Sequence, residues 1–269
     1  MRVVVVGMGV QGAKRQAAAG RDAVATVDPV RPADYRNLAE VPPDSYDAAL
    51  LCVPDEPKLP LMLDLVRRGK HLLVEKPVLG EPAAIQRVID AASATGAVCY
   101  TAYNHRFEPH FVRMKALIDS GTLGRIYSVR LFYGNGTARL VRDSAWRDTG
   151  SGVLADLGSH LLDTVHFWMG VPDAPFALTM ANRFENRSPD HVVLTSAGKI
   201  AIQFEMTMLS WRNHFTCDVL AENGSAHIES LCKWGPSTFR HRRRVLPAGR
   251  PPEESVTLVQ DDPTWAAEY

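Results

Sequence analysis

The chain has 269 residues, 46% of them hydrophobic, which is enough for one large domain or two modest ones. Its 30 basic and 30 acidic residues cancel, which argues against the broad basic surface of a nonspecific nucleic-acid-binding protein. No uncharged apolar run approaches the ~20 residues needed to cross a bilayer. The four cysteines form no C-x-x-C pair and follow no signal peptide. We therefore expect a cytoplasmic protein with a small-molecule partner, and neither a nucleic acid nor a membrane as partner.

The first hundred residues alternate short apolar runs with patterns typical of helices. The apolar runs predict strands at residues 3–6, 48–53, 71–74 and 97–102, and another that ends at Asp28. Helical spacing of apolar residues predicts helices from the first strand to about Ala19, at residues 59–66 and at residues 85–92. This alternation predicts an α/β domain, residues 1–103, with a parallel sheet covered by helices.

The remaining residues, 104–269, have a different character. Helices are predicted at about residues 109–119 and 153–168. Residues 200–207 alternate apolar and more polar side chains, as in a strand with one buried face. Asn223-Gly224 predicts a hairpin turn. We predict a second, α+β domain with a mainly antiparallel sheet.

A glycine motif joins the first predicted strand to the first predicted helix. It consists of Gly7, Met8, Gly9, Val10, Gln11 and Gly12, a G-x-G-x-x-G sequence. The first glycine permits a tight turn, the second lets a pyrophosphate approach the backbone, and the third allows close helix–strand packing. The N–H groups that open the helix, at Val10 and Gln11, favour an anion. A bare connecting turn is the alternative, but the strand–helix context favours a dinucleotide site.

Asp28 lies 21 residues after Gly7, at the end of the second predicted strand. A carboxylate there can accept hydrogen bonds from the adenosine ribose and would repel a 2′-phosphate, which favours NAD. Arg31 is close enough to leave NADP open. Aspartate at a strand end is also a common turn residue.

Two further positions have side chains suited to redox chemistry. Lys76 follows a predicted strand at the carboxyl edge of the sheet, where it could stabilise negative charge on a substrate oxygen; an exposed loop lysine is the alternative. Asp156 and His160 are four residues apart on a predicted helix, on a face extended by Asp163 and Thr164. A histidine can take the proton released when an alcohol is oxidised, with Asp156 orienting it.

Two other interpretations of the Asp156/His160 pair remain. One is a polar helix surface, and the other is a metal pair completed by His166 or another residue. No further cluster of metal ligands is evident in the sequence, so we predict no metal.

Four segments together resemble the Gfo/Idh/MocA family of NAD(P)-dependent oxidoreductases. They are the glycine motif, residues 69–77 (GKHLLVEKP), residues 103–107 (YNHRF) and residues 156–160 (DLGSH). The resemblance extends from residue 1 to about residue 170. It implies a Rossmann domain followed by a domain with an open, mainly antiparallel sheet for substrate binding and oligomerisation.

The resemblance also implies roles for individual residues. The nicotinamide would lie between the domains beside Lys76, with Lys76, Asp156 and His160 facing the substrate. Asn104 and Arg106 would lie near the nicotinamide and the substrate. Pro54 and Glu75 would contact the cofactor. Pro77 is often cis in relatives.

The family mostly acts on sugars, cyclitols and nucleotide-linked sugars, and relatives are commonly dimers or tetramers. We therefore predict an NAD(P)-dependent dehydrogenase, as a homo-oligomer, that acts on a secondary alcohol or ketone of such a compound. Alternatives are a redox-neutral, NAD-dependent glycoside hydrolase and a noncatalytic dinucleotide-binding protein. The arginines of residues 240–244 could also grip a substrate phosphate, although strand alternation would split them between two faces.

The sequence departs from the family pattern in three places. Residues 53–58, VPDEPK, replace a T-P-N-x-x-H stretch and so lack its asparagine and histidine. The chain between Asp28 and Tyr46 is short for the usual helix. Residues 261–265 resemble a helix start close to the end of the chain at Tyr269, so we expect the family's usual C-terminal helices to be missing.

Overall fold

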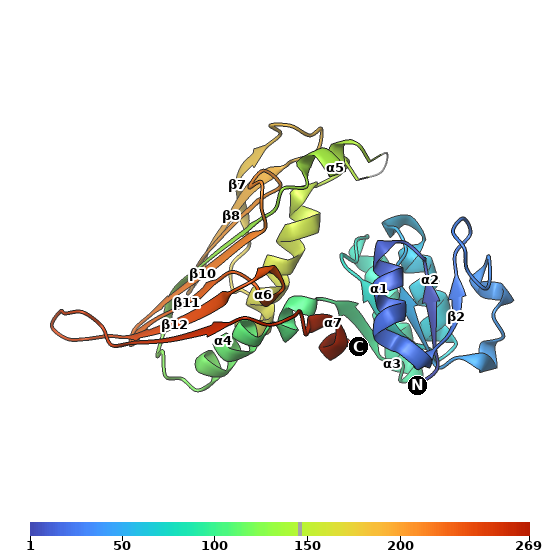
Figure 1. The fold of residues 1–269 in the computed structure, drawn as a ribbon, viewed down its shortest axis with the longest axis horizontal. Coiled ribbons are helices and arrows are strands. Elements are labelled where there is room, and N and C mark those ends of the chain that lie inside the picture. The colour runs from blue at the N-terminus through green and yellow to red at the C-terminus, as the bar shows by residue number, and fades with distance from the viewer. Residues whose placement is uncertain (145–146) are drawn as a thin grey trace. The chain divides into compact units, whose positions relative to one another are not determined.

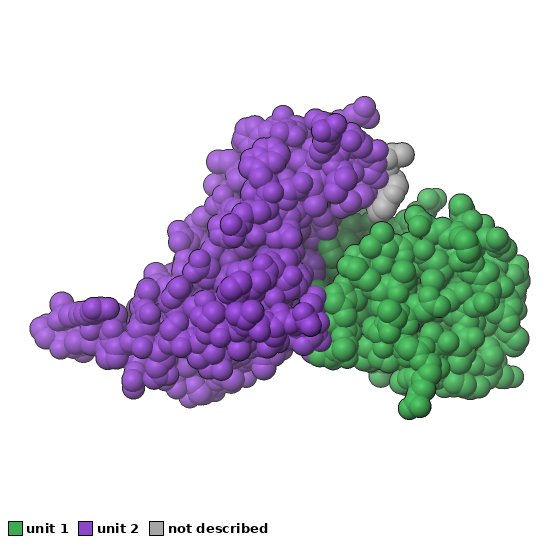
Figure 2. Space-filling view, viewed as in Figure 1, with its two compact units in different colours: residues 1–104, 265–269 green, residues 105–264 purple. Residues whose placement is uncertain are grey.

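The chain folds into two compact units. The computed structural model describes residues 1–144 and 147–269. Its first unit comprises residues 1–104 and 265–269, and its second unit comprises residues 105–264 (Figure 2). The last five residues therefore belong to the first unit. No helix in the described part of the chain is both long and apolar enough to cross a membrane.

The first unit is built on a five-stranded sheet in the order β2-β1-β3-β4-β5, with all strands parallel. The strands are β1 (Val3–Val6), β2 (Ala23–Val27), β3 (Ala48–Leu51), β4 (His71–Glu75) and β5 (Cys99–Ala102). Every residue of β1 and β3 is buried, as expected where helices cover both faces of a parallel sheet. Between β1 and β3 the strand order reverses, which is the position where open α/β sheets bind ligands.

Helices cover both faces of this sheet (Figure 1). They are α1 (Val10–Ala19), α2 (Asp55–Arg67) and α3 (Pro82–Thr95), with the short 3-10 turns η1 (Gly20–Asp22), η2 (Leu38–Glu40) and η3 (Pro43–Ser45). One core cluster joins β1 and β3 to α2 and α3, and another, on the opposite face, includes Ala19 of α1. Between β2 and β3 the chain forms only η2 and η3, in agreement with the short connection noted in the sequence.

The second unit contains an eight-stranded sheet in the order β13-β12-β11-β10-β6-β9-β8-β7. Its strands are β6 (Ile126–Gly134), β7 (Ala177–Asn182), β8 (His191–Ala197), β9 (Ala201–Thr207), β10 (His214–Ala221), β11 (Gly224–Glu229), β12 (Ser237–Arg243) and β13 (Glu253–Leu258). β6 and β9 are parallel, and the other neighbours are antiparallel. The predicted fold class, a Rossmann sheet plus an open, mainly antiparallel sheet, is confirmed. The hairpin at Asn223-Gly224 joins β10 to β11.

Helices pack on one face of the large sheet (Figure 1). The remaining elements are α4 (Pro109–Asp119), α5 (Ala138–Arg142), α6 (Ser159–Met169) and α7 (Thr264–Glu268), with η4 (Asn104–Phe107), η5 (Leu154–Gly158) and η6 (Cys232–Trp234). Phe111 of α4 and Trp168 of α6 belong to the same core cluster as Phe204 and Phe215 of the sheet. The opposite face carries polar side chains, described below.

The helix predicted at residues 153–168 has two parts. Leu154–Gly158 form a turn of π-helix, and α6 continues from Ser159 to Met169. A Cβ on Gly158 would crowd the sulfur of Met206 and the side chain of Leu154, so the wide turn lies tightly against β9. A π turn of this kind often occurs at a functional site.

Candidate active site

The glycine loop lies at the point where the strand order of the first sheet reverses. Gly7 has a φ of +92°, and its N–H donates to the carbonyl of Val27 at 2.8 Å. A Cβ on Gly7 would collide with the carbonyl of Cys52, and a Cβ on Gly12 would collide with the carbonyl of Gly7. The turn and the close approach of α1 to β1 therefore require glycine at both positions.

Gly9 differs from the other two glycines, because a Cβ there would meet no atom within 4 Å. Packing within the unit therefore does not require glycine at this position, whereas an approaching pyrophosphate would. Gly9 also precedes α1, whose amino end has no side-chain cap and no acidic residue in its first turn. Val10 and Gln11 are exposed there. Unsatisfied N–H groups beside open space fit a dinucleotide phosphate.

Asp28 lies directly after β2 and ties that strand end to the glycine loop. One of its oxygens, Oδ2, accepts the Met8 N–H at 2.7 Å, and Oδ1 accepts the N–H groups of Val30 and Arg31 at 2.8 and 2.7 Å. Burial would raise the pKa of Asp28, but hydrogen bonds from Arg31, Val30 and Met8 lower it below its usual range. An ionised Asp28 therefore shapes the loop. Its contact with a ribose stays a prediction.

Lys76 follows the end of β4, in a turn with a cis Lys76–Pro77 peptide bond. The preceding residue, Glu75, accepts a hydrogen bond at 2.8 Å from Nε of Arg15, a buried residue of α1. The half-buried Lys76 thus lies beside a carboxylate held by the helix that begins at the glycine loop.

Lys58 reaches the same turn from α2. Its side chain is almost completely buried, and Nζ donates to the Pro77 carbonyl at 2.6 Å and to Asp55 Oδ1 at 2.8 Å. Pro54 directly precedes Asp55, the first residue of α2. Lys58 occupies the histidine position of the family pattern, so this departure from the pattern supplies a cation that holds the Lys76–Pro77 turn. We did not predict this role from the sequence.

His160 lies in the first turn of α6, and only 7% of its surface is exposed. Its imidazole ring stacks on that of His105, with centroids 4.1 Å apart and planes 21° apart. Tyr133 of β6 lies against both rings, at 5.4 Å from His105 and 6.1 Å from His160. Burial and the nearby charge of Asp156 raise the pKa of Tyr133, so its hydroxyl stays neutral. His105, which we did not single out from the sequence, thus packs face to face on the His160 ring.

The acidic residues near His160 contact two arginines. Asp163 receives Arg106 in a bidentate pair, with Nη2–Oδ1 and Nε–Oδ2 distances of 2.6 and 2.9 Å. Asp156 lies in the π-helical turn, 3.6 Å from Arg147 Nη2. Because the turn is wider than an α-helical turn, the predicted four-residue spacing does not by itself place Asp156 on the face of His160. The second unit nevertheless brings together His160, Arg106 and Asp163.

The predicted residues therefore form one group in each unit. The glycine loop, Asp28, Pro54, Glu75 and Lys76 lie at or just after the carboxyl ends of strands in the first unit. Arg106, Asp156 and His160 belong to the second unit. Asn104 is 8% exposed and is the last residue of the first unit before the chain enters the second.

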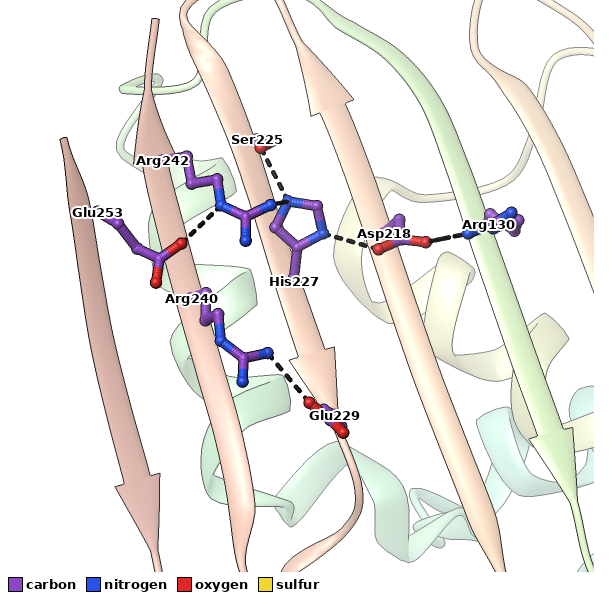
Figure 3. A network of polar contacts seen from close by, with 8 residues as sticks. All are labelled: Arg130, Asp218, Ser225, His227, Glu229, Arg240, Arg242 and Glu253. Carbon is purple, nitrogen blue, oxygen red and sulfur yellow. Dashed lines mark hydrogen bonds and ion pairs between the residues drawn. The ribbon is translucent and has the colours of Figure 1, made fainter. Parts of the chain in front are cut away.

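Arg240 and Arg242 of β12 contribute to a charged network on the sheet face opposite the helices (Figure 3). Arg240 pairs with Glu229 at 3.0 Å, and Arg242 pairs with Glu253 at 2.6 Å. Arg243 lies 3.3 Å from Glu254. Each of these guanidinium groups already has a carboxylate partner, which weakens the hypothesis that the run binds a substrate phosphate.

Two family models match most of the chain. One, described as an oxidoreductase family with an NAD-binding Rossmann fold, matches residues 1–103. The other, described as a Gfo/Idh/MocA C-terminal domain, matches residues 111–227. The fold and the glycine loop define a two-domain protein with a dinucleotide-binding Rossmann domain. The chain belongs to the Gfo/Idh/MocA oxidoreductase family, as the sequence motifs predicted.

Relatives with assigned activities are similar over part of their length. The chain is 30% identical over 133 residues to the scyllo-inositol 2-dehydrogenase (NADP(+)) IolW of Bacillus subtilis strain 168, covering 48% of this chain and 37% of that protein. It is 26% identical over 164 residues to the inositol 2-dehydrogenase of Rhizobium meliloti strain 1021, covering 58% and 49%. The matches thus span less than half of either relative.

The fold is similar to that of a levoglucosan dehydrogenase solved in complex with NADH and levoglucosan. The TM-score is 0.79 at 18% identity, and the match covers 96% of this chain and 80% of that structure. At this identity, the similarity supports the fold.

Proposed function

We propose that this protein transfers a hydride between NAD or NADP and a secondary alcohol or ketone of a sugar, cyclitol or nucleotide-linked sugar. The observation that carries the proposal is the glycine loop, in which Gly9 leaves open space beside the uncapped amino end of α1. The relatives named as inositol dehydrogenases support the substrate class.

Each chemical step of this reaction has a candidate residue in this chain. When bound, the nicotinamide cofactor supplies the hydride acceptor or donor. Oxidation of a secondary alcohol removes a hydride from carbon and a proton from oxygen, and His160 accepts the proton. Lys76 donates a hydrogen bond to the same oxygen and stabilises its developing charge. Asp156 orients the His160 ring. Arg106 and Asn104 bind substrate hydroxyl groups.

The cofactor would be held by the backbone of the glycine loop and by residues after the strands. The N–H groups at the start of α1 bind the pyrophosphate, and Asp28 binds the adenosine ribose. Asp28 favours NAD, but Arg31 and Arg36 lie beside it: Nη1 of Arg36 donates to the carbonyls of Asp28 and Arg31 at 3.4 and 2.9 Å. Because these two arginines could pair with the 2′-phosphate of NADP, binding of NADP remains compatible with the proposal.

A combined activity and binding experiment tests the proposal. Purified protein is assayed with NAD and NADP against inositols, free sugars and nucleotide-linked sugars. Lys76→Ala is expected to lower kcat by roughly 100- to 1000-fold and His160→Asn by about 100-fold or more, because each removes a group that acts on the reacting oxygen. The Kd for the reduced cofactor, measured by fluorescence, is expected to change little.

Lys199→Ala is the matched control, because Lys199 is exposed at the turn between β8 and β9. Turnover that survives Lys76→Ala unchanged would contradict the proposed role. Release of an aglycone without accumulation of NADH would identify a glycoside hydrolase instead. Cofactor binding without turnover of any substrate class would favour a noncatalytic dinucleotide-binding protein.

A further inference from the structure

Three residues with metal-binding side chains converge in the second unit, and none of them has a role in the proposed hydride transfer. Glu108 precedes α4, Cys232 begins η6, and Asp262 precedes α7. One ligand atom from each residue lies within 4.8 Å of the others. These residues form no cluster in the sequence, because Glu108 and Cys232 are more than a hundred positions apart and Cys232 and Asp262 are thirty positions apart.

The cluster has a buried acceptor that needs a partner. Glu108 and Cys232 are each 2% exposed. Oε2 of Glu108 accepts the Cys232 N–H at 3.2 Å, whereas its Oε1 is buried and has no hydrogen-bond partner among the described residues. A buried carboxylate oxygen without a partner is costly, and a bound cation would satisfy it.

Asp262 offers the third ligand from a partly exposed position. Its Oδ1 accepts hydrogen bonds from the N–H and hydroxyl of Thr264, at 2.9 and 2.6 Å, and these bonds orient the carboxylate. Because Asp262 is partly exposed, an ion can enter on its side of the cluster. The three ligands are therefore two carboxylates and one cysteine sulfur, which is a donor set for Zn²⁺ rather than for the oxygen-preferring ions Ca²⁺ and Mg²⁺.

We propose that Glu108, Cys232 and Asp262 form a binding site for a divalent cation of the Zn²⁺ type. The three protein ligands leave further coordination positions for water. The position of the site along the chain determines which segments the ion would connect. Glu108 lies just after the chain enters the second unit at residue 105, and Asp262 lies just before it leaves at residue 264. One ion would thus join the second unit's two terminal segments to η6.

Cobalt titration of the full chain, freed of any affinity tag and of metal by a chelator, tests the site directly. Co²⁺ bound to a cysteine thiolate gives a near-ultraviolet charge-transfer band. Added Zn²⁺ should displace the Co²⁺ and abolish this band. We expect the wild type to bind a single equivalent and to show a higher Tm with Zn²⁺. The variant Cys232→Ser should lose the band, whereas Cys99→Ser, which changes an exposed cysteine, should retain it.

Two carboxamide variants keep the test independent of folding defects. Asp262→Asn retains an oxygen that can accept from Thr264, and Glu108→Gln retains one for the Cys232 N–H; both should weaken Zn²⁺ binding by about tenfold or more. Circular dichroism without metal confirms that each variant is folded. Absence of the band in the wild type, or a band and a Zn²⁺ affinity that Cys232→Ser and Asp262→Asn leave unchanged, would overturn the proposal. Neither readout depends on dehydrogenase activity.

Discussion

Two lysines of the first unit hold backbone carbonyls at opposite edges of the same parallel sheet. Lys58 binds the Pro77 carbonyl after β4, at the carboxyl edge. Lys70 precedes β4 and binds the carbonyls of Pro43 and Tyr46 at 2.7 and 2.8 Å, at the amino edge. Only the first of these bonds adjoins Lys76. Lys58 can therefore affect the position of Lys76, whereas Lys70 contributes only to the stability of the opposite edge.

This difference predicts distinct effects of the same substitution. Lys58→Met keeps the apolar stem but removes the cation that holds the Pro77 carbonyl, so kcat should fall roughly 10- to 100-fold as Lys76 loses its position. The Kd for NADH should change little. The matched control, Lys70→Met, should lower stability without lowering kcat. Equal kcat values for the two variants, measured with a substrate of the wild type, would rule out a positioning role for Lys58.

At the scale of elements, α4 packs against both α6, the helix that carries His160, and the large sheet. Phe111 and Trp168 join these helices, and the indole Nε1 donates to the Phe111 carbonyl at 3.0 Å. His110, next to Phe111, uses its Nε2 to donate to the Ser237 carbonyl of β12 at 3.0 Å and is 2% exposed. A buried histidine thus joins α4 to the sheet.

The environment of His110 predicts a dependence of stability on pH. Burial lowers the pKa of His110 and Arg113 acts in the same direction, although the bond to Ser237 opposes them. As the pH falls below about 6.5, the unfolded chain therefore binds more protons than the folded chain, and stability is lost towards the lower folded-state pKa. In urea denaturation between about pH 7.5 and about pH 5.5, His110→Gln should lose less stability than the wild type.

Glutamine is suitable because its amide nitrogen can still donate to Ser237. The control is His166→Gln, which makes the same substitution at an exposed histidine on α6. An identical loss of stability in His110→Gln and the wild type would show that His110 does not contribute to the acid sensitivity.

At the scale of the whole molecule, the last residues of the chain pack on the first unit. Arg15 of α1 donates to Glu268 at 2.6 Å and to Glu75 at 2.8 Å, and the Arg15 and Glu268 side chains are 2% and 0% exposed. The ring of Trp265 lies 4.4 Å from the Arg15 guanidinium carbon. The start of a helix that the sequence indicated therefore becomes α7, which covers α1.

Removal of one partner from this buried network should destabilise the first unit strongly. Glu268→Ala leaves the buried Arg15 guanidinium with one carboxylate partner, and the free energy of unfolding should fall by about 3–5 kcal/mol. Glu229→Ala breaks the exposed pair with Arg240 and should cost less than about 1 kcal/mol. Chemical denaturation of the two variants measures both effects. A cost for Glu268→Ala as small as that for Glu229→Ala would contradict the buried network.

Features that depend on neighbouring residues could be predicted from the sequence. The G-x-G-x-x-G loop, the alternation in β9 and the hairpin at Asn223-Gly224 each reflect a local backbone or burial requirement. The family motifs added the correct two-sheet architecture. The π-helical turn at residues 154–158 was missed, because so short a change of period leaves the apolar stripe of the helix intact.

The candidate site could be predicted only in part, because some of its contacts are local and others join distant residues. The sequence by itself determined the dinucleotide loop, since the glycines are required by backbone geometry within a few residues. Only the tertiary structure joined Lys58 to Pro77, His105 to His160 and Glu108 to Cys232. These contacts connect residues that lie far apart along the chain or on different elements. Their partners are chosen by packing of helices on sheets, which local spacing does not encode.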